Sequence, residues 1–163
     1  MQLDSAFFPT QILSEQEDSF FSGEIELNHQ LIECSLEIDK QLSAYPDLIT
    51  SAENLLDQLD QLNLNALVEI EQDYFDDHEG ACAVYFQRYA EYLAEEGMVD
   101  AEDYETEQLL YHLKLKAITL TVQEELGELI LCLSYGVEQG AFSELLAVYF
   151  DQDGNLAIII HKH

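Results

Sequence analysis

The chain has 163 residues, of which 48% are apolar, and its 34 acidic and 5 basic residues give it a formal net charge of -29. This length fits a single domain, and the apolar content excludes the low-hydrophobicity composition of a disordered chain. The negative field of so acidic a surface attracts cationic partners and disfavours nucleic acid and anionic membranes as partners.

The three cysteines, Cys34, Cys82 and Cys132, lie far apart in the chain. Their spacing matches no Cys-x-x-Cys or metal motif, so we expect buried free thiols in a reducing compartment. The first residues lack the charge and apolar pattern of a signal peptide, and no apolar run reaches the roughly 20 residues of a membrane-spanning helix. The sequence therefore predicts one cytoplasmic domain over residues 1–163.

The first patterned segment follows residues 1–18, which carry no clear pattern and are expected to be loosely ordered. From Phe20 to Ile38, apolar side chains alternate with carboxylates, which is typical of two half-buried strands. Asn28 and His29 suit the tight turn between these strands. The segment is therefore predicted to be a β-hairpin with an acidic outer face.

After Pro46 the apolar period becomes helical, and Pro46 suits the first turn of a helix. Asn63 and Asn65 are expected to end the first helix, and Gly97 to cap the third. Four helices are predicted, over residues 48–62, 66–77, 81–96 and 104–113.

From Lys114 onward the pattern returns to strands, which are predicted over residues 115–122, 129–137, 145–150 and 156–161. The order of the elements predicts the α+β class. We expect an antiparallel sheet of about four to six strands with three to four helices packed on one face, in the order β-hairpin, helices, β-meander.

The string Asp151-Gln152-Asp153-Gly154 resembles the start of a calcium-binding loop. Such a loop needs a bidentate glutamate at its twelfth position, whereas this string runs into the apolar segment 156–160. A β-hairpin turn accounts for the same residues, because Asp and Gly supply its backbone geometry. We therefore predict a turn at this place.

The acidic middle of the chain is the main candidate site: from Glu69 to Glu107 there are 14 acidic residues and one basic residue, Arg88. Like charges at helical spacing repel by roughly a few tenths of a kcal/mol per pair. The cluster fits a solvated face kept for solubility, a docking face for a basic protein, or a hard-cation site. The candidate partner-binding residues are Glu69, Asp73, Asp76, Asp77, Tyr89, Glu95 and Glu96.

Tyr89 is included because it lies off the helical stripe of Val84, Tyr85 and Tyr92 and is therefore predicted to be exposed. Exposed tyrosines beside carboxylates are typical of interface hot spots.

A metal site is the weaker alternative for the acidic middle, with Asp73, Asp77 and His78 as candidate ligands and Asp76 beside them. As a catalytic base His78 would need a reacting group within hydrogen-bond reach, and the sequence indicates none. The chain also lacks nucleotide-binding, nucleophile-elbow and zinc-protease motifs. No catalytic residue and no cofactor are therefore predicted.

His161 and His163 flank Lys162 near the end of the chain and are expected to be frayed. A His-x-His pair on one strand face can bind zinc, but two ligands are too few.

Three segments carry a resemblance to a known family: the hairpin SGEIELNHQLIECSLEID, the helical stretch IEQDYFDDHEGACAVYF and the strand pair LLAVYFDQDGNLAIII. Their layout resembles that of the DUF2004-like families of bacterial domains. The resemblance is one of order and texture and includes no catalytic signature. It implies a small acidic bacterial domain of a kind thought to include immunity and partner-binding proteins.

The sequence thus favours a non-enzymatic module that docks a basic protein through its acidic helical face. An immunity or inhibitor protein directed against a cationic nuclease-type toxin is the concrete form of this hypothesis. One alternative is a metal-dependent enzyme that uses Asp73, Asp76, Asp77 and His78. The other is a self-associating structural protein, a homodimer rather than a monomer, whose strands 145–150 and 156–160 meet at a sheet edge.

Overall fold

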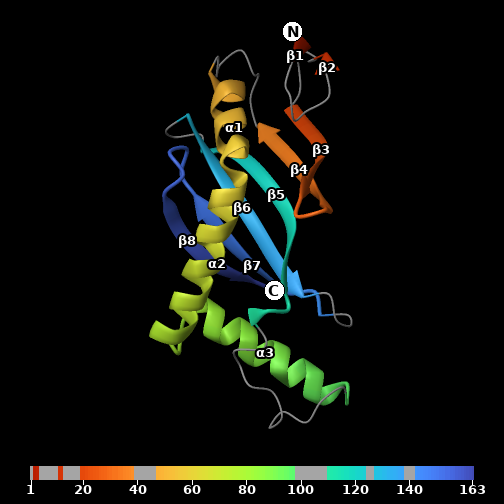
Figure 1. Ribbon diagram of the computed structural model, residues 1–163, viewed down its shortest axis with the longest axis vertical. Helices are drawn as coiled ribbons and strands as arrows, with labels where there is room; N and C mark the ends of the chain where they lie inside the picture. The colour runs from red at the N-terminus through yellow and green to blue at the C-terminus, as the bar shows by residue number, and fades with distance from the viewer. Residues whose placement is uncertain are drawn as a thin grey trace.

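A computed structural model of the protein describes residues 2–3, 11–12, 19–38, 47–97, 110–123, 127–137 and 142–163. Its centre is a six-stranded sheet in the order β3-β4-β5-β6-β7-β8, with three helices on one face (Figure 1). The strands are β3 Ser19–Leu27, β4 Gln30–Ile38, β5 Leu113–Gln123, β6 Glu128–Val137, β7 Leu145–Phe150 and β8 Leu156–Lys162. The helices are α1 Leu48–Asp57, α2 Leu59–Asp76 and α3 Ala81–Glu95, and the short strands β1 Gln2–Leu3 and β2 Gln11–Ile12 form a separate pair.

The predicted α+β class is confirmed, with its order of hairpin, helices and strand meander. One feature of the sheet differs from the expectation: β4 and β5 run parallel, whereas every other neighbouring pair in the six-stranded sheet is antiparallel. The helices come between β4 and β5 in the chain, and a long crossover of this kind allows parallel pairing. The expectation of a wholly antiparallel sheet is corrected at this one pair.

The predicted hairpin is confirmed as β3 and β4, which pair from Ser19 opposite Ile38 to Leu27 opposite Gln30. Its turn residues Asn28 and His29 have φ values of 51° and 65°, the left-handed geometry of the tight turns that suit twisted strands. Ile32, Cys34 and Leu36 of β4 are buried, whereas Leu31 and the two glutamates of the strand are exposed. Period-2 alternation therefore decided which side of this strand faces the helices.

The helices α1 and α2 form an almost continuous column across the sheet (Figure 1), separated only at Gln58. The prediction that Asn63 and Asn65 end a helix is wrong, because both lie inside α2. Asn63 is buried, and its side-chain carbonyl accepts a 2.6 Å hydrogen bond from the Tyr135 hydroxyl of β6. This partner on the sheet satisfies a polar group that would otherwise disfavour the helix interior.

The helix α3 crosses one end of the sheet and packs against β7 and β8. Gly97 follows it with a φ of 65°, which confirms the predicted cap. Most of the predicted helix 104–113 lies outside the described residues, and its last residue, Leu113, begins β5 instead.

The helices and the six-stranded sheet share one apolar core. Cys34, Cys82 and Cys132 are buried free thiols in it or beside it, as predicted. None of the described helices is long and apolar enough to cross a membrane.

The turn between β7 and β8 is also as predicted. The Asp151 carboxylate accepts hydrogen bonds from the backbone N–H groups of Asp153 and Asn155 at 3.0 and 2.9 Å, and Gly154 has a φ of 82°. These contacts are those of an Asx-type turn, which accounts for the calcium-loop-like string.

Candidate functional site: the outer face of α2

The outer face of α2 exposes a row of large apolar side chains. Leu64 is 58% exposed, Val68 51% and Phe75 47%. Spacings of four and seven residues place them along one side of the helix. We call these three residues the α2 stripe; exposed apolar groups gathered in this way are typical of interaction sites.

A groove lies beside the α2 stripe, where α2 approaches the start of β5. Its volume is about 340 Å³. Tyr111 on its wall is 83% exposed. The groove is lined by Leu67, Ile70, Glu71, Phe75, Leu110, Tyr111 and Leu113, so Glu71 places a carboxylate in an otherwise largely apolar lining.

The predicted docking residues divide into two groups. Asp76 and Asp77 are exposed where α2 ends, and Glu95 and Glu96 are exposed where α3 ends. The 15 residues of α3 separate them, a length of about 22 Å at about 1.5 Å per residue. Glu69 is half-buried on α2. The two groups therefore lie at opposite ends of α3, and the first group shares α2 with the α2 stripe or directly follows it.

Tyr89, predicted to be exposed, is 0% exposed, so that prediction is wrong. Its ring centroid lies 5.3 Å from that of Phe142, and its hydroxyl lies 3.5 Å from the Nδ1 atom of His112. The segment before β7 covers this side of α3, which the helical stripe alone did not indicate. Tyr89 belongs to the core and cannot touch a partner directly.

Asp73 and Asp77 have structural roles at the turn between α2 and α3. The Asp73 carboxylate accepts a 3.2 Å hydrogen bond from the backbone N–H of Cys82, and that of Asp77 accepts one of 3.0 Å from Glu79. At Gly80 a Cβ atom would lie 3.0 Å from the Asp77 carboxylate, so the turn leaves little room for a side chain. The Asp73 carboxylate therefore satisfies a backbone N–H in the first turn of α3, where negative charge is favourable, and Asp77 closes the turn before it.

The predicted metal ligands Asp73, Asp77 and His78 do not converge. Over the described part of the chain, the group whose ligand atoms lie within 4.8 Å of one another is a different one, Glu144, His161 and His163. The carboxylates of Asp73 and Asp77 are instead engaged by backbone N–H groups.

The sequence analysis missed Glu144, which precedes β7 and joins α3 to β8. The Nε of Arg88 donates to both of its oxygens at 2.8 Å, and His161 Nε2 lies 2.7 Å from Oε2. The hydrogen bonds from Arg88, with a further contribution from His161, lower the pKa of Glu144 to about 2 although burial opposes the shift. Arg88 is thus held by an anion beneath α3 and does not neutralise the α2 face.

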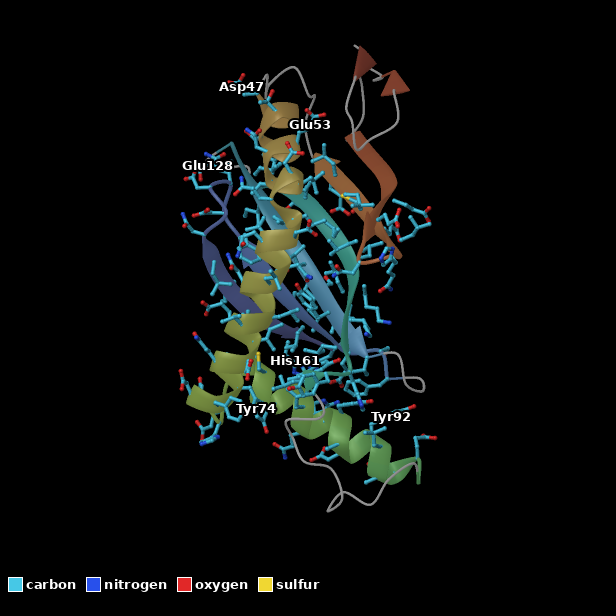
Figure 2. The ribbon with its side chains drawn as sticks, in the orientation of Figure 1. Asp47, Glu53, Tyr74, Tyr92, Glu128 and His161 are labelled. Atoms are coloured by element: carbon cyan, nitrogen blue, oxygen red, sulfur yellow. The ribbon has the colours of Figure 1, made fainter. Side chains whose placement is uncertain are left out.

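The expectation that His161 is frayed is wrong, because it lies in β8, paired with Leu146 of β7, and its side chain is only 7% exposed beside α3 (Figure 2). Its ring meets the Tyr85 ring edge-on at 5.7 Å. His163, next to it on the same strand face, is exposed.

The edge strand β8 forms a second exposed apolar surface, on the sheet face that carries no described helix. Leu156 is 39% exposed, Ile158 53% and Ile160 39%. Residues 156–163 contain no acidic side chain. This strand is therefore the least acidic edge of the described sheet.

No family model, curated protein or solved structure matches the chain. The resemblance to the DUF2004-like families stays a prediction.

Proposed function

We propose that the protein is a non-enzymatic protein-binding module that docks a basic partner on the outer face of α2. The observation that carries this proposal is the α2 stripe of Leu64, Val68 and Phe75, which is exposed on a helix whose flanking exposed charges are carboxylates. Protein interfaces combine an apolar centre with a polar rim. The α2 face has both parts.

The carboxylates at the end of α2 support the proposal because they do not favour the helix that carries them. The last turn of α2 contains Asp73 and Asp76 and no basic residue. Negative charge at a helix C-terminus opposes the helix dipole, at a cost of about 0.3–1 kcal/mol per group. Asp73 offsets this cost by capping α3, whereas Asp76 caps no helix among the described residues. A basic partner would give the Asp76 carboxylate a favourable contact.

The chemistry of the groove indicates the kind of segment that docks. An amphipathic segment could place apolar side chains beside Phe75 and Tyr111 and lysines or arginines beside Glu71 and Asp76. The charge of -29 would accelerate its encounter with a cationic protein. An immunity or inhibitor protein for a cationic nuclease-type toxin remains the concrete form of the proposal.

The test compares two triple variants with the same change in net charge. One neutralises Glu71, Asp76 and Glu79 beside the α2 stripe, and the other neutralises Glu24, Glu33 and Glu37 on the hairpin. Both proteins, with an affinity tag, are used to capture partners at low salt, and the affinity of each identified partner is then measured against salt concentration.

We expect the α2 variant to bind about tenfold more weakly, because three exposed ion pairs contribute about 0.5 kcal/mol each. The hairpin variant should retain most of its affinity. Equal losses in the two variants would mean that the charge acts as a general ion exchanger, and would contradict docking on α2.

A second pair of variants tests the apolar centre separately. Val68→Ser combined with Phe75→Ser should abolish the same complex, whereas Leu31→Ser, at a residue that is 64% exposed on the hairpin, should leave it intact. A complex that survives the first change but weakens with salt would be purely electrostatic and would remove the α2 stripe from the proposal.

A second candidate function is self-association through β8, which is favoured by its exposed Ile158 and Ile160 and by the absence of acid in residues 156–163. Sheet edges of this kind pair readily. Sedimentation at moderate salt should then give a dimer that Ile158→Lys converts to a monomer; a monomeric unmodified protein would remove this candidate.

A further inference from the structure

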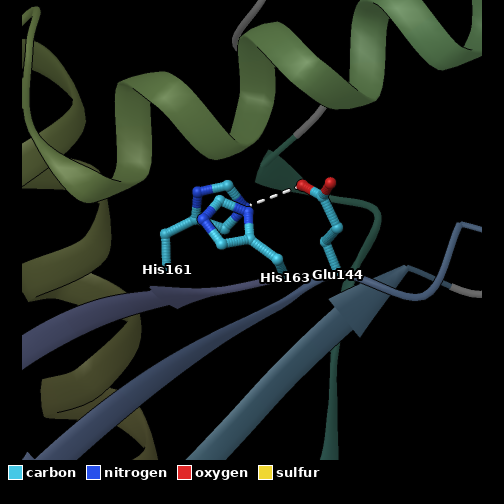
Figure 3. A group of neighbouring side chains, drawn as sticks. All are labelled: Glu144, His161 and His163. Carbon is cyan, nitrogen blue, oxygen red and sulfur yellow. Dashed lines mark hydrogen bonds and ion pairs between the residues drawn. The ribbon is translucent and has the colours of Figure 1, made fainter.

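We propose that Glu144, His161 and His163 form a binding site for a divalent transition metal of the zinc type, beneath α3 and separate from the α2 face. Figure 3 shows the three side chains gathered between α3 and the ends of β7 and β8. The proposal does not depend on the docking function.

The three donor atoms come from the start of β7, which Glu144 precedes, and from the end of β8, which contains His161 and is followed by His163. Oε2 of Glu144 lies 2.7 Å from Nε2 of His161, and the rings of His161 and His163 have centroids 4.5 Å apart. The donor atoms of all three residues lie within 4.8 Å of one another. In a tetrahedral site with bonds of about 2.0–2.2 Å, neighbouring donor atoms are about 3.3 Å apart. Rotation of the exposed His163 side chain can bring its ring to that distance.

The donor set decides the class of ion. Two imidazoles and one carboxylate are ligands of zinc sites that keep a fourth position open for water. Magnesium and calcium prefer oxygen ligands alone. The site therefore favours zinc and its neighbours over the hard cations that a general acidic surface attracts.

A buried hydroxyl gives an independent indication of a missing ligand. Tyr85 is 0% exposed, and its hydroxyl has no hydrogen-bond partner among the described residues. Its ring lies edge-on against that of His161 at 5.7 Å, and burial raises its pKa, with smaller contributions from Tyr89 and from the charge of Glu144. Buried hydroxyls nearly always have partners. Water in the open position of a metal at this site would supply one.

Arg88 is the charged group that faces the site from α3, and its cation must be accommodated. Nη2 of Arg88 donates to Oε1 of Glu144 and its Nε donates to both oxygens, whereas His161 is on Oε2 alone, so a metal on Oε2 would displace one of the Arg88 contacts. Carboxylate ligands in metal sites are commonly hydrogen-bonded by an outer partner, and Arg88 can keep this role on Oε1. The metal would replace the proton shared by Oε2 and His161 Nε2, and that proton would pass to solvent.

The test uses the full chain, stripped of metal by a chelator and then titrated with zinc against a chromophoric chelator. A large excess of magnesium is present at physiological ionic strength, so that the exposed carboxylates elsewhere on the protein are occupied and do not bind zinc. We expect one zinc ion per chain. His163→Ala should weaken binding by more than about 100-fold, because loss of even an outer partner costs about 10–100-fold. His29→Ala is the matched control, since His29 is fully exposed on the hairpin, and it should leave the affinity unchanged.

Cobalt(II) provides a second readout, because a tetrahedral site gives visible absorption bands that a hydrated ion lacks. The bands should appear with the unmodified protein and disappear in His163→Ala and in Glu144→Gln, with circular dichroism confirming that both variants are folded. Unchanged zinc affinity in His163→Ala, or no zinc binding in competition with magnesium, would overturn the proposal without affecting the docking function.

Discussion

The outer face of α2 and the corner of the sheet where β5 begins and β8 ends differ sharply in charge. On the described helices the single basic residue is Arg88, which Glu144 holds. The sheet corner carries the other three basic residues of the described chain, Lys114, Lys116 and Lys162. The side chain of Lys116 lies over Gly136, since a Cβ atom added at Gly136 would be 3.4 Å from the Cγ atom of Lys116.

This difference teaches that the net charge of -29 is not spread evenly. A surface kept acidic only for solubility would gain from interspersed charges of both signs. No basic residue lies on α2 itself, so a basic partner meets no cation on the helix that carries the α2 stripe, although Lys114 follows Leu113 of the groove lining. The following predictions compare substitutions of buried and exposed side chains by their effect on the free energy of unfolding.

The largest expected effect compares two phenylalanines of the helical layer. Phe86 is 0% exposed on the inner side of α3, and Phe75 is 47% exposed on α2. Phe86→Ala should lower the free energy of unfolding by about 3–5 kcal/mol, because it leaves a cavity in the core. Phe75→Ala should change it by less than about 1 kcal/mol. Urea unfolding measures both; similar losses would mean that the α2 stripe is part of the core.

The next effect concerns a buried polar contact that ties α2 to the sheet. Tyr135→Phe removes the donor to the buried Asn63 carbonyl, and should lower the free energy of unfolding by about 1–3 kcal/mol. Tyr111→Phe is the control, because Tyr111 is 83% exposed, and it should be neutral within about 0.5 kcal/mol. A neutral Tyr135→Phe would show that Asn63 finds another partner.

A pH effect follows from the buried thiols. Burial raises the pKa of Cys34 from 9.0 to about 12, so the folded state keeps a proton that the unfolded chain releases. The resulting stability is complete below about pH 9 and is lost as the pH rises towards about 12. The loss should reach about 1.4 kcal/mol near pH 10. Urea midpoints measured from about pH 8 to 10 should fall less steeply in Cys34→Ala, and parallel curves would contradict this assignment.

The smallest effects separate two carboxylates at the end of α2. Asp73→Ala should destabilise the protein by about 0.5–2 kcal/mol, because the backbone N–H of Cys82 loses its cap. Asp76→Asn should instead stabilise it by about 0.3–1 kcal/mol, because it removes negative charge from a helix C-terminus. Thermal unfolding at low salt measures both. A destabilising Asp76→Asn would give Asp76 a structural role and weaken its assignment to the docking face.

Much of the local structure could be predicted from the sequence. The hairpin, the turn at Asp151–Asn155 and the later strands were predicted to within about two residues at most of their ends, because alternation and turn chemistry act over short distances. The predictions failed where a contact with a distant part of the chain determines the local structure. Asn63 lies inside a helix and accepts a hydrogen bond from Tyr135, and Tyr89 is buried against Phe142.

The candidate sites divide in the same way. The charge, the α+β class and the acidity of the α2–α3 region follow from the sequence by itself, because composition and periodicity are local properties. The parallel pairing of β4 with β5 and the joining of Glu144 to His161, 17 residues away, were decided only by the tertiary structure. Strand pairing and side-chain convergence depend on which segments the shared core brings together, and no spacing along the chain carries that information.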